Sequence, residues 1–361
     1  MKNVFAFLFT VLTLTVLSTS AFAQVQVGIV LPTKDEERWI QDADRFRAAL
    51  KTAGLTAEIM FSEKDSAKEK ANVETLTTKG MKVLILCPYD SAAAASSADA
   101  AHKAGVKVLS YDRLITSTKN VDFFVTFDSI NVGAAWSKYL ISKAKGKGNN
   151  LYIYSGDPAS DNAFLFFRGA WNEIQPKIAD GTFKIVNSSK AEALQNKQKL
   201  TRDEEAGIIG QVTTLWSPSE AKSKAEAHLT AATAVQKGIC YVLSPNDQTA
   251  RAIADVFAKD KDVKMAYTTG QDADKASVQY IIDGKQSMTV LKDVRVLVSD
   301  AIKASKLYLD GKSPVSTKTY FNGVVEVPAN PSSTTSVTQE NLKAAIVDSG
   351  YYTSSDFVGL K

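Results

Sequence analysis

Residues 106–114 read Val-Lys-Val-Leu-Ser-Tyr-Asp-Arg-Leu and give the clearest indication of the fold. The mostly apolar start is typical of a buried strand, and the strand ends in an acid beside a guanidinium, Asp112 and Arg113. In an open α/β sheet, ligands bind just beyond the carboxyl ends of the strands. A carboxylate only accepts hydrogen bonds and a guanidinium only donates them, so the pair suits a neutral polyol better than a charged ligand. The alternative is a surface turn with a solvated ion pair.

Strand-like and helix-like segments alternate on both sides of this stretch. Apolar runs predict strands at 25–31, 57–61, 83–87, 123–127, 151–154, 183–186 and 239–243. Helical patterns are expected between them at 67–79, 91–104, 132–144 and 163–174. Strands separated by helices indicate βαβ units and a parallel sheet.

The second half of the chain repeats features of the first. Residues 82–90 and 238–247 are both apolar strands that end in a proline, a polar or aromatic residue and an acid. Residues 106–113 are likewise repeated by 263–272, which end in Gly-Gln-Asp. The sequence therefore predicts an α/β protein with two similar open, doubly wound parallel sheets facing each other across a cleft, where small ligands often bind.

The segment after the first strand is predicted to be a helix that carries cleft residues. Thr33 and Glu36 fit a capping box at its start, and apolar residues recur at helical spacing over 39–50. Arg38 and Trp39 lie in its first turns, close to the carboxyl end of the strand. Trp39 suits core packing or ligand stacking equally. Arg38 is harder to bury without a partner, which favours a position in the cleft.

Composition excludes several classes of function. A chain of 361 residues suggests about two domains, and a net charge of +4 without a basic cluster argues against nucleic-acid binding. Cys87 and Cys240 lie in apolar runs, and we expect buried free thiols in different lobes. Two histidines and two distant cysteines form no pattern of a metal site, so neither metal nor cofactor is predicted. Residues 190–207 are highly charged, which indicates a solvated helical excursion or a flexible loop.

The first 23 residues are typical of an export signal. A basic start precedes an apolar stretch at 4–17, and Ala21-Phe22-Ala23 is a small-x-small cleavage site. An uncleaved membrane anchor is the alternative, but the apolar stretch is short for one. Cleavage after Ala23 would leave Gln24 at the start of the mature chain, without a cysteine for lipid attachment. We therefore expect export to a periplasm.

Six motifs in this order resemble the periplasmic monosaccharide-binding proteins of the type I fold, most of all the xylose-binding proteins and the multiple-sugar-binding virulence receptor. They are Glu37-Arg38-Trp39, Tyr111-Asp112-Arg113-Leu114, Asp161-Asn162-Ala163-Phe164, Ser244-Pro245-Asn246-Asp247, Gly270-Gln271-Asp272-Ala273 and Lys292 after an apolar strand. The resemblance spans nearly the whole mature chain. It implies two lobes joined by three chain crossings, with an N-lobe of 25–131 plus 293–319 and a C-lobe of 132–292 plus 320–361.

The resemblance also implies which residues bind the sugar. They are Arg38, Asp112, Arg113, Asn162, Trp216, Asn246, Asp272 and Lys292. Trp39 is added to the predicted site because of its position in the first helix. Trp216 would be an apolar wall for the sugar ring, although the charged segment before it is longer than is usual for the family. The family usually has an acid two positions before Asn162, where this chain has Ser160, which would alter which hydroxyl is read.

The implied function is that of a monomeric solute receptor. It would deliver an aldopyranose such as xylose, glucose or galactose to the permease of an ABC importer, and perform no catalysis. A chemoreceptor is a further candidate partner. A secreted sugar-acting enzyme is the alternative, because Asp112 and Asp272 could form a glycosidase-like carboxylate pair. A sugar-responsive repressor would need an N-terminal helix-turn-helix where this chain has its export signal.

Overall fold

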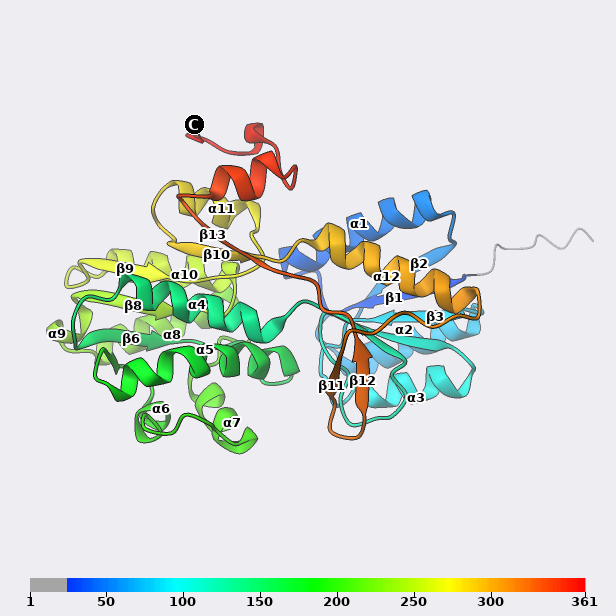
Figure 1. Cartoon of the computed structure of the whole chain (residues 1–361), viewed down its shortest axis with the longest axis horizontal. Helices are drawn as coiled ribbons and strands as arrows, with labels where there is room; N and C mark the ends of the chain where they lie inside the picture. The colour runs from blue at the N-terminus through cyan, green and yellow to red at the C-terminus, as the bar shows by residue number, and fades with distance from the viewer. Residues whose placement is uncertain (1–24, 361) are drawn as a thin grey trace, which may run out of the picture.

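The computed structural model describes residues 25–360 and shows two α/β lobes joined by extended segments (Figure 1). The predicted export signal, residues 1–23, lies outside the described part of the chain. Within the described part, no helix is both long enough and apolar enough to cross a membrane.

The first lobe is built on a seven-stranded sheet with the order β11-β12-β5-β4-β3-β1-β2. Strands β1 to β5 pair in parallel with their neighbours, and β11 and β12 form an antiparallel hairpin at one edge. The strands are β1 (Val27–Leu31), β2 (Ala57–Phe61), β3 (Val83–Leu86), β4 (Lys107–Tyr111), β5 (Phe123–Val125), β11 (Lys318–Phe321) and β12 (Glu326–Ala329).

Helices cover both faces of this sheet, so its strands are apolar on both sides. Successive residues of β1 point to opposite faces: Ile29 packs with Phe46 and Leu297, whereas Val30 packs with Val73. One face therefore carries α1 and α12, and the other carries α2 and α3. These helices are α1 (Glu37–Ala53), α2 (Ser66–Thr78), α3 (Ala95–Lys103) and α12 (Val294–Leu309).

The second lobe has a parallel four-stranded sheet, β7-β6-β8-β9, and a separate antiparallel pair, β10-β13. Helices α4 and α5 pack on one side of the main sheet, and α8 and α10 pack on the other (Figure 1). The strands are β6 (Asn149–Ile153), β7 (Phe183–Ile185), β8 (Ile239–Leu243), β9 (Met265–Thr268), β10 (Met288–Leu291) and β13 (Thr335–Thr338). The helices are α4 (Ser129–Lys143), α5 (Asp161–Ala179), α8 (Pro218–Ala231), α9 (Ala234–Lys237), α10 (Asp247–Lys259) and α11 (Lys275–Ile282), followed near the C-terminus by a π-helix (Lys343–Asp348) and a 3₁₀ turn (Ser354–Asp356).

Glycines let α4 and α5 approach closely. A Cβ atom added at Gly133 would lie 1.9 Å from the carbonyl oxygen of Phe166. One added at Gly169 would lie 2.0 Å from the carbonyl oxygen of Ile130. Any larger residue would push the two helices apart, and α5 carries side chains of the cleft on its first turns. The glycine contact therefore helps to fix the position of the site.

Within residues 25–360 the chain passes between the lobes three times, at 126–128, 292–293 and 330–334. The third passage lies later than predicted. Residues 320–329 were expected in the second lobe, but β12 extends the first sheet, where Ala329 pairs with Phe124. The prediction was wrong there because the tail returns to the first sheet as a hairpin before it crosses.

The predicted capping box at the start of α1 is also wrong. The helix begins at Glu37, and Glu36 stands at the N-cap position without a capping side-chain hydrogen bond. The hydroxyl of Thr33 instead accepts a hydrogen bond from the backbone N–H of Asp35 at 3.0 Å. This leaves the Glu36 carboxylate free to take part in the cleft.

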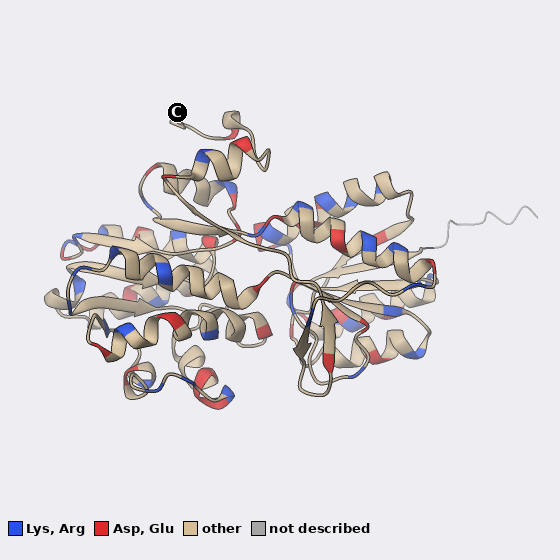
Figure 2. Cartoon of the chain, viewed as in Figure 1, with Lys and Arg blue, Asp and Glu red and all other residues tan. Residues whose placement is uncertain are grey.

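The charged segment 190–207 forms a packed excursion rather than a flexible loop. It contributes to helices α6 (Ser189–Ala193) and α7 (Arg202–Val212), which lie below α5 in Figure 1. Figure 2 shows acidic and basic residues side by side on α7. The buried apolar residues of α7 are Ile208, Ile209 and Val212. They lie after the charged segment 190–207, so that segment by itself shows no apolar face. The indole N–H of Trp171 donates to the carbonyl of Lys197 at 3.0 Å and ties the excursion to α5.

The two cysteines lie in different lobes as free, buried thiols, as predicted. Cys87 follows β3 in the first sheet, and Cys240 lies in β8 of the second. Burial raises the pKa of the Cys87 thiol well above its usual value and that of Cys240 to about 12. Both thiols therefore stay protonated at neutral pH and act as small apolar side chains.

Candidate functional site

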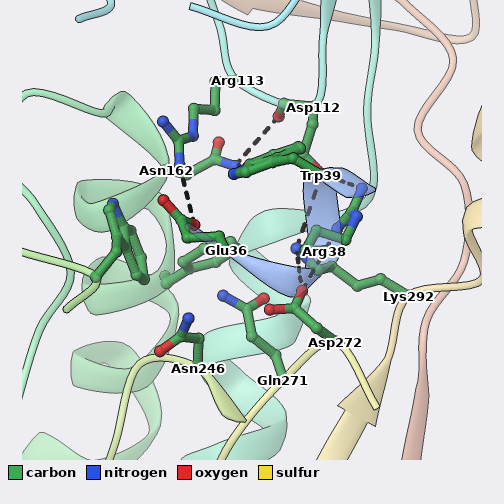
Figure 3. A pocket seen from close by; sticks show the side chains of 12 residues that line it. Glu36, Arg38, Trp39, Asp112, Arg113, Asn162, Asn246, Gln271, Asp272 and Lys292 are labelled. Carbon is green, nitrogen blue, oxygen red and sulfur yellow. Dashed lines mark hydrogen bonds and ion pairs between the residues drawn. The ribbon is translucent and has the colours of Figure 1, made fainter. Parts of the chain in front are cut away.

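A cavity of about 300 Å³ lies between the lobes, where the strand ends of both sheets face each other. All nine residues that the sequence predicted for the site lie around it, together with Glu36, Phe166 and Gln271 (Figure 3). The lining residues are Glu36, Arg38, Trp39, Asp112, Arg113, Asn162, Phe166, Trp216, Asn246, Gln271, Asp272 and Lys292.

Asp112 and Arg113 follow β4, as the sequence predicted. Asp112 has φ 58°, a left-handed conformation that aspartate tolerates better than most residues, and its N–H donates to the carbonyl of Val125 at 2.8 Å. The Arg113 guanidinium donates to the carbonyl of Pro88 at 3.3 Å and lies 3.6 Å from a carboxylate oxygen of Glu36. Both side chains are buried, so the solvated surface turn is excluded.

Arg38 is the centre of a buried ion network in the first lobe. Its Nε donates to Asp42, one turn further along α1, at 2.5 Å, and its Nη2 donates to Asp112 at 2.9 Å. The hydroxyl of Tyr111 also donates to Asp42. Arg38 is only 6% exposed, and two carboxylates from its own lobe compensate for this burial. The network aligns Arg38 from within the first lobe.

Asp272 is the counterpart of Asp112 in the second lobe. It follows β9, has φ 99°, and its N–H donates to the carbonyl of Val290 at 2.9 Å. The loop that holds it is fixed by the buried carboxylate of Asp247, which accepts hydrogen bonds from the backbone of Asp274 at 3.1 Å and from Thr289 at 3.0 Å. Positive φ angles at both aspartates are the kind of strain that functional sites retain.

Lys292 links the two aspartates from the second chain crossing. Its Nζ lies 2.9 Å from Asp272 and 3.7 Å from Asp112. Arg38 also reaches across the cleft, with Nη1 at 3.4 Å from Asp272. Three acidic and three basic side chains line the cavity, so their formal charges cancel.

The second lobe adds amide groups to the cavity. Asn162, in the first turn of α5, donates to the carboxylate of Asp112 at 3.0 Å. Asn246 caps α10 by accepting from the backbone N–H of Thr249 at 3.3 Å, and it also accepts from the Thr249 hydroxyl at 2.6 Å. Figure 3 shows its amide nitrogen directed toward the cavity. Within the described chain, the side-chain oxygens of Asn162 and Gln271 are buried without a hydrogen-bond partner. These oxygens are ready acceptors for a polar ligand.

Trp216 forms an aromatic wall on the same side. Its backbone has φ 54°, and its ring lies edge-on to Phe166 with 6.3 Å between ring centroids. Gly156 allows this position, because a Cβ atom there would lie 2.0 Å from the indole. The indole N–H of Trp216 is also buried without a partner among residues 25–360. On the opposite wall the guanidinium of Arg113 lies 4.9 Å from the Trp39 ring centroid, so Trp39 serves both core packing and the cavity.

The two acids of the first-lobe half have opposite pKa shifts. Burial acts to raise the pKa of Asp112, but the charges of Lys292, Arg38 and Arg113 outweigh it and hold this pKa below its usual range. Burial raises the pKa of Glu36, and the nearby Arg113 guanidinium offsets only part of this rise. Asp112 is therefore the firmly ionised acceptor of the cavity.

Sequence reasoning missed three lining residues. Glu36 was assigned to a capping box that does not form. Gln271 lies inside the quoted motif Gly270-Gln271-Asp272-Ala273, and its position beside Asp272 could have suggested it. Phe166 lies one helical turn after Asn162 on α5, so helical spacing from a predicted site residue was the available signal.

The sequence profile of the periplasmic binding protein domain matches residues 27–313, a range that includes the whole cavity lining. The chain belongs to this family. Its α/β lobes with parallel sheets agree with the predicted type I fold.

Two relatives with known roles cover most of the chain. The multiple sugar-binding periplasmic receptor ChvE of Rhizobium radiobacter is 32% identical over 336 residues, which is 90% of each chain. The D-xylose-binding periplasmic protein of Escherichia coli is 27% identical over 98% of this chain and 99% of its own. Both are periplasmic proteins, and this agrees with the predicted class and compartment.

Solved structures give the same grouping. A carbohydrate transporter solute-binding protein from Chloroflexus aurantiacus, in complex with D-glucose, is 63% identical with a TM-score of 0.92, over 93% of this chain and 98% of its own. An ABC transporter solute-binding protein from Clostridium phytofermentans, with bound β-D-glucose, is 30% identical with a TM-score of 0.80, over 92% of this chain and 99% of its own.

Proposed function

We propose that this protein captures one neutral monosaccharide between its lobes and delivers it to an ABC importer. One observation carries the proposal: the cavity combines six charged side chains whose charges cancel with buried donors and acceptors that have no partner in the described chain. A buried polar group left unpaired costs about 1–3 kcal/mol. Sugar hydroxyls, which both donate and accept, would satisfy these groups.

The charge balance favours a neutral sugar over a charged one. Asp112 and Asp272 are matched by Arg38 and Lys292, and Glu36 is matched by Arg113. An added carboxylate or ammonium group would be a buried charge without a free counter-ion, and such a charge costs several kcal/mol. The relatives support an aldopyranose, because D-glucose is bound in two of the similar structures and D-xylose is named for one relative.

We also propose that the protein acts in sugar transport. The similar structures come from transporter solute-binding proteins, so an ABC permease is the proposed partner, and a chemoreceptor is a second one. We further propose that the chain is exported by cleavage after Ala23 and acts in the periplasm as a monomer. Mass spectrometry of the protein from its host would detect the new N-terminus at Gln24.

The predicted carboxylate pair, Asp112 and Asp272, does not suit the glycosidase alternative. A glycosidase needs one carboxylic acid with a raised pKa to protonate the leaving group. Asp112 instead has a lowered pKa, and Asp272 shares Lys292 with it as a common counter-ion. Two carboxylates that share one lysine in this way suit the role of acceptors for hydroxyl groups.

Calorimetry on the mature protein tests the proposal. We expect D-glucose, D-xylose or D-galactose to bind at least roughly tenfold more tightly than D-glucuronate and D-glucosamine, since ~1.4 kcal/mol separates affinities by a factor of ten. Tighter binding of a charged sugar, or no binding of any monosaccharide, would refute the proposal. Hydrolysis of aryl glycosides by the same sample would favour the enzyme instead.

A further inference from the structure

The lobes also touch each other away from the cavity, at Ser91. This serine lies in the loop after β3 of the first lobe. Its backbone contacts the loop before α5 of the second lobe, and its side chain contacts the first residue of α5. Its N–H donates to the carbonyl of Ala159 at 2.9 Å, and its hydroxyl accepts from the N–H of Asp161 at 3.0 Å. Ser91 is 4% exposed and is not one of the twelve cavity residues.

Each side of this contact is held in shape by its own lobe. In the first lobe, the carbonyl of Ser91 accepts from the N–H of Thr116 at 2.8 Å, and Asp90 accepts from the two backbone N–H groups after Ser91 at 2.9 and 2.8 Å. In the second lobe, the side chain of Asp157 accepts from the N–H of Ala159 at 2.9 Å. Both loops are therefore ordered before they meet, which lowers the entropic cost of the contact.

The charged excursion supports the second-lobe side. Arg202, the first residue of α7, pairs with the Asp161 carboxylate at 2.9 Å, and its guanidinium carbon lies 3.2 Å from the centre of the Phe164 ring. One turn further along α7, Glu205 forms two hydrogen bonds of 2.7 Å with Arg168 of α5. These contacts fasten α7 to the start of α5, where Asp161 lies.

We propose that Ser91 and residues 159–161 form an interlobe clasp, and that α7 braces it through Arg202. This rests on the proposed function, in which the lobes open and close around a sugar. The two hydrogen bonds of the clasp join different lobes and exist only when the lobes are closed. The clasp therefore stabilises the closed state without contact to the ligand. A group that favours the binding-competent state raises the apparent affinity by shifting its population.

The test compares Ser91→Ala with Ser96→Ala, a matched control at an exposed serine of α3 whose hydroxyl donates to the carbonyl of Ala93, in the turn just before that helix of the same lobe. Calorimetry with D-glucose should show roughly three- to tenfold weaker binding for Ser91→Ala, the range expected for one lost hydrogen bond. In stopped-flow experiments the dissociation rate should rise by a similar factor and the association rate should change little. The melting temperature without sugar should equal that of the parent.

A second variant, Arg202→Gln, tests the brace and should weaken binding in the same direction but less. Amide hydrogen exchange at Asp161, measured with saturating sugar, should be faster in Ser91→Ala than in the parent. Parental affinity and dissociation rate in Ser91→Ala would overturn the clasp while leaving the proposed function intact. A parent protein that binds no sugar would overturn the proposed function itself, so the two failures are distinguishable.

Discussion

The two halves of the cavity are built differently. In the first lobe, Arg38, Asp42 and Tyr111 are bonded to one another within the lobe, so that half is ordered whether or not the lobes meet. In the second lobe, Asn162 and Gln271 each carry a buried oxygen without a partner in the described chain. The charges of the first half are therefore fixed before closure, and the second half adds, beside the charge of Asp272, amide oxygens that closure brings to the ligand.

The aspartates at the two strand ends show this difference most clearly. Asp112 and Asp272 share a positive φ and a hydrogen bond from their N–H to the next strand. Their side chains differ, because that of Asp112 is 4% exposed and accepts from both Arg38 and Asn162, whereas that of Asp272 is 12% exposed and has Lys292 as its near partner. The same backbone conformation thus presents a more buried carboxylate, Asp112, in the first lobe and a more exposed one, Asp272, in the second.

The largest effect is expected from Asp112→Ala. Charge-assisted hydrogen bonds contribute about 1.5–3 kcal/mol each. Loss of those to the ligand, with Arg38 and Lys292 left short of a counter-ion, should weaken sugar binding about 100-fold or more at ~1.4 kcal/mol per tenfold. Asp272→Ala should cost roughly tenfold by the same arithmetic. Calorimetry with D-glucose measures both.

Asp90→Ala is the control for this pair. Asp90 lies in the loop after the neighbouring strand β3, is partly exposed, and does not line the cavity. It accepts hydrogen bonds from the N–H groups of Ala92 and Ala93, so its loss should lower stability by about 1 kcal/mol, as for a helix cap. Because these bonds also order the loop of Ser91, affinity should fall by less than roughly tenfold, far short of the loss in Asp112→Ala. If Asp112→Ala and Asp272→Ala lost sugar affinity to the same extent, the two aspartates would contribute equally, and the proposed difference between the two halves of the cavity would be wrong.

A second comparison separates binding from folding. Asn162→Ala should weaken sugar binding roughly tenfold, because it removes an acceptor of the cavity, and should leave the melting temperature of the sugar-free protein nearly unchanged. Asp42→Asn should mainly lower the melting temperature of the sugar-free protein, because Asp42 is fully buried and neutralises Arg38. Its effect on affinity should be smaller and indirect, through the alignment of Arg38. Thermal melts with and without D-glucose distinguish the two outcomes. If sugar-free Asn162→Ala had a melting temperature as low as that of Asp42→Asn, the assignment of Asn162 to binding and of Asp42 to folding would be wrong.

Much of this site could be predicted because strand ends are visible in the sequence. Asp112 and Arg113 follow an apolar run directly, and in a parallel sheet the carboxyl ends of neighbouring strands lie together. The role of Arg38 was foreseen from the cost of burying an unpaired guanidinium. Trp216 came from the family resemblance, because its place at the cavity depends on the packed excursion before it.

The missed features depend on contacts between distant segments. Glu36 matched a local capping pattern, but its carboxylate instead faces Arg113, which lies 77 positions later in the numbering of the chain. Residues 320–329 read as part of the tail, and only their pairing with β5 places them in the first sheet. The excursion at 190–207 lacked an apolar face within its own bounds. Local patterns do not encode such long-range pairings.

The weakest effect on sugar affinity is expected at Glu69, a buried carboxylate on α2 of the first lobe that does not line the cavity. It accepts from the N–H of Tyr89 at 2.8 Å, and burial raises its pKa to about 7, which that bond and the charge of Arg113 reduce only in part. Because the folded pKa lies above the unfolded one, the folded protein binds the proton more tightly. The contribution of Glu69 to stability is therefore fully present below its unfolded pKa of about 4.5 and is lost as the pH rises through about 7.

Glu69→Gln removes this pH dependence while keeping an acceptor for Tyr89. The variant should gain stability relative to the parent between pH 5 and pH 8, by about 1–3 kcal/mol, since each pKa unit corresponds to about 1.4 kcal/mol. Glu74→Gln, at an exposed glutamate of the same helix, should show no such trend. Thermal melts of all three proteins at both pH values provide the measurement, with D-glucose affinity expected to stay at the parental value. A constant difference between variant and parent across this range would mean that Glu69 ionises normally and that the loop at Tyr89 is held by other contacts.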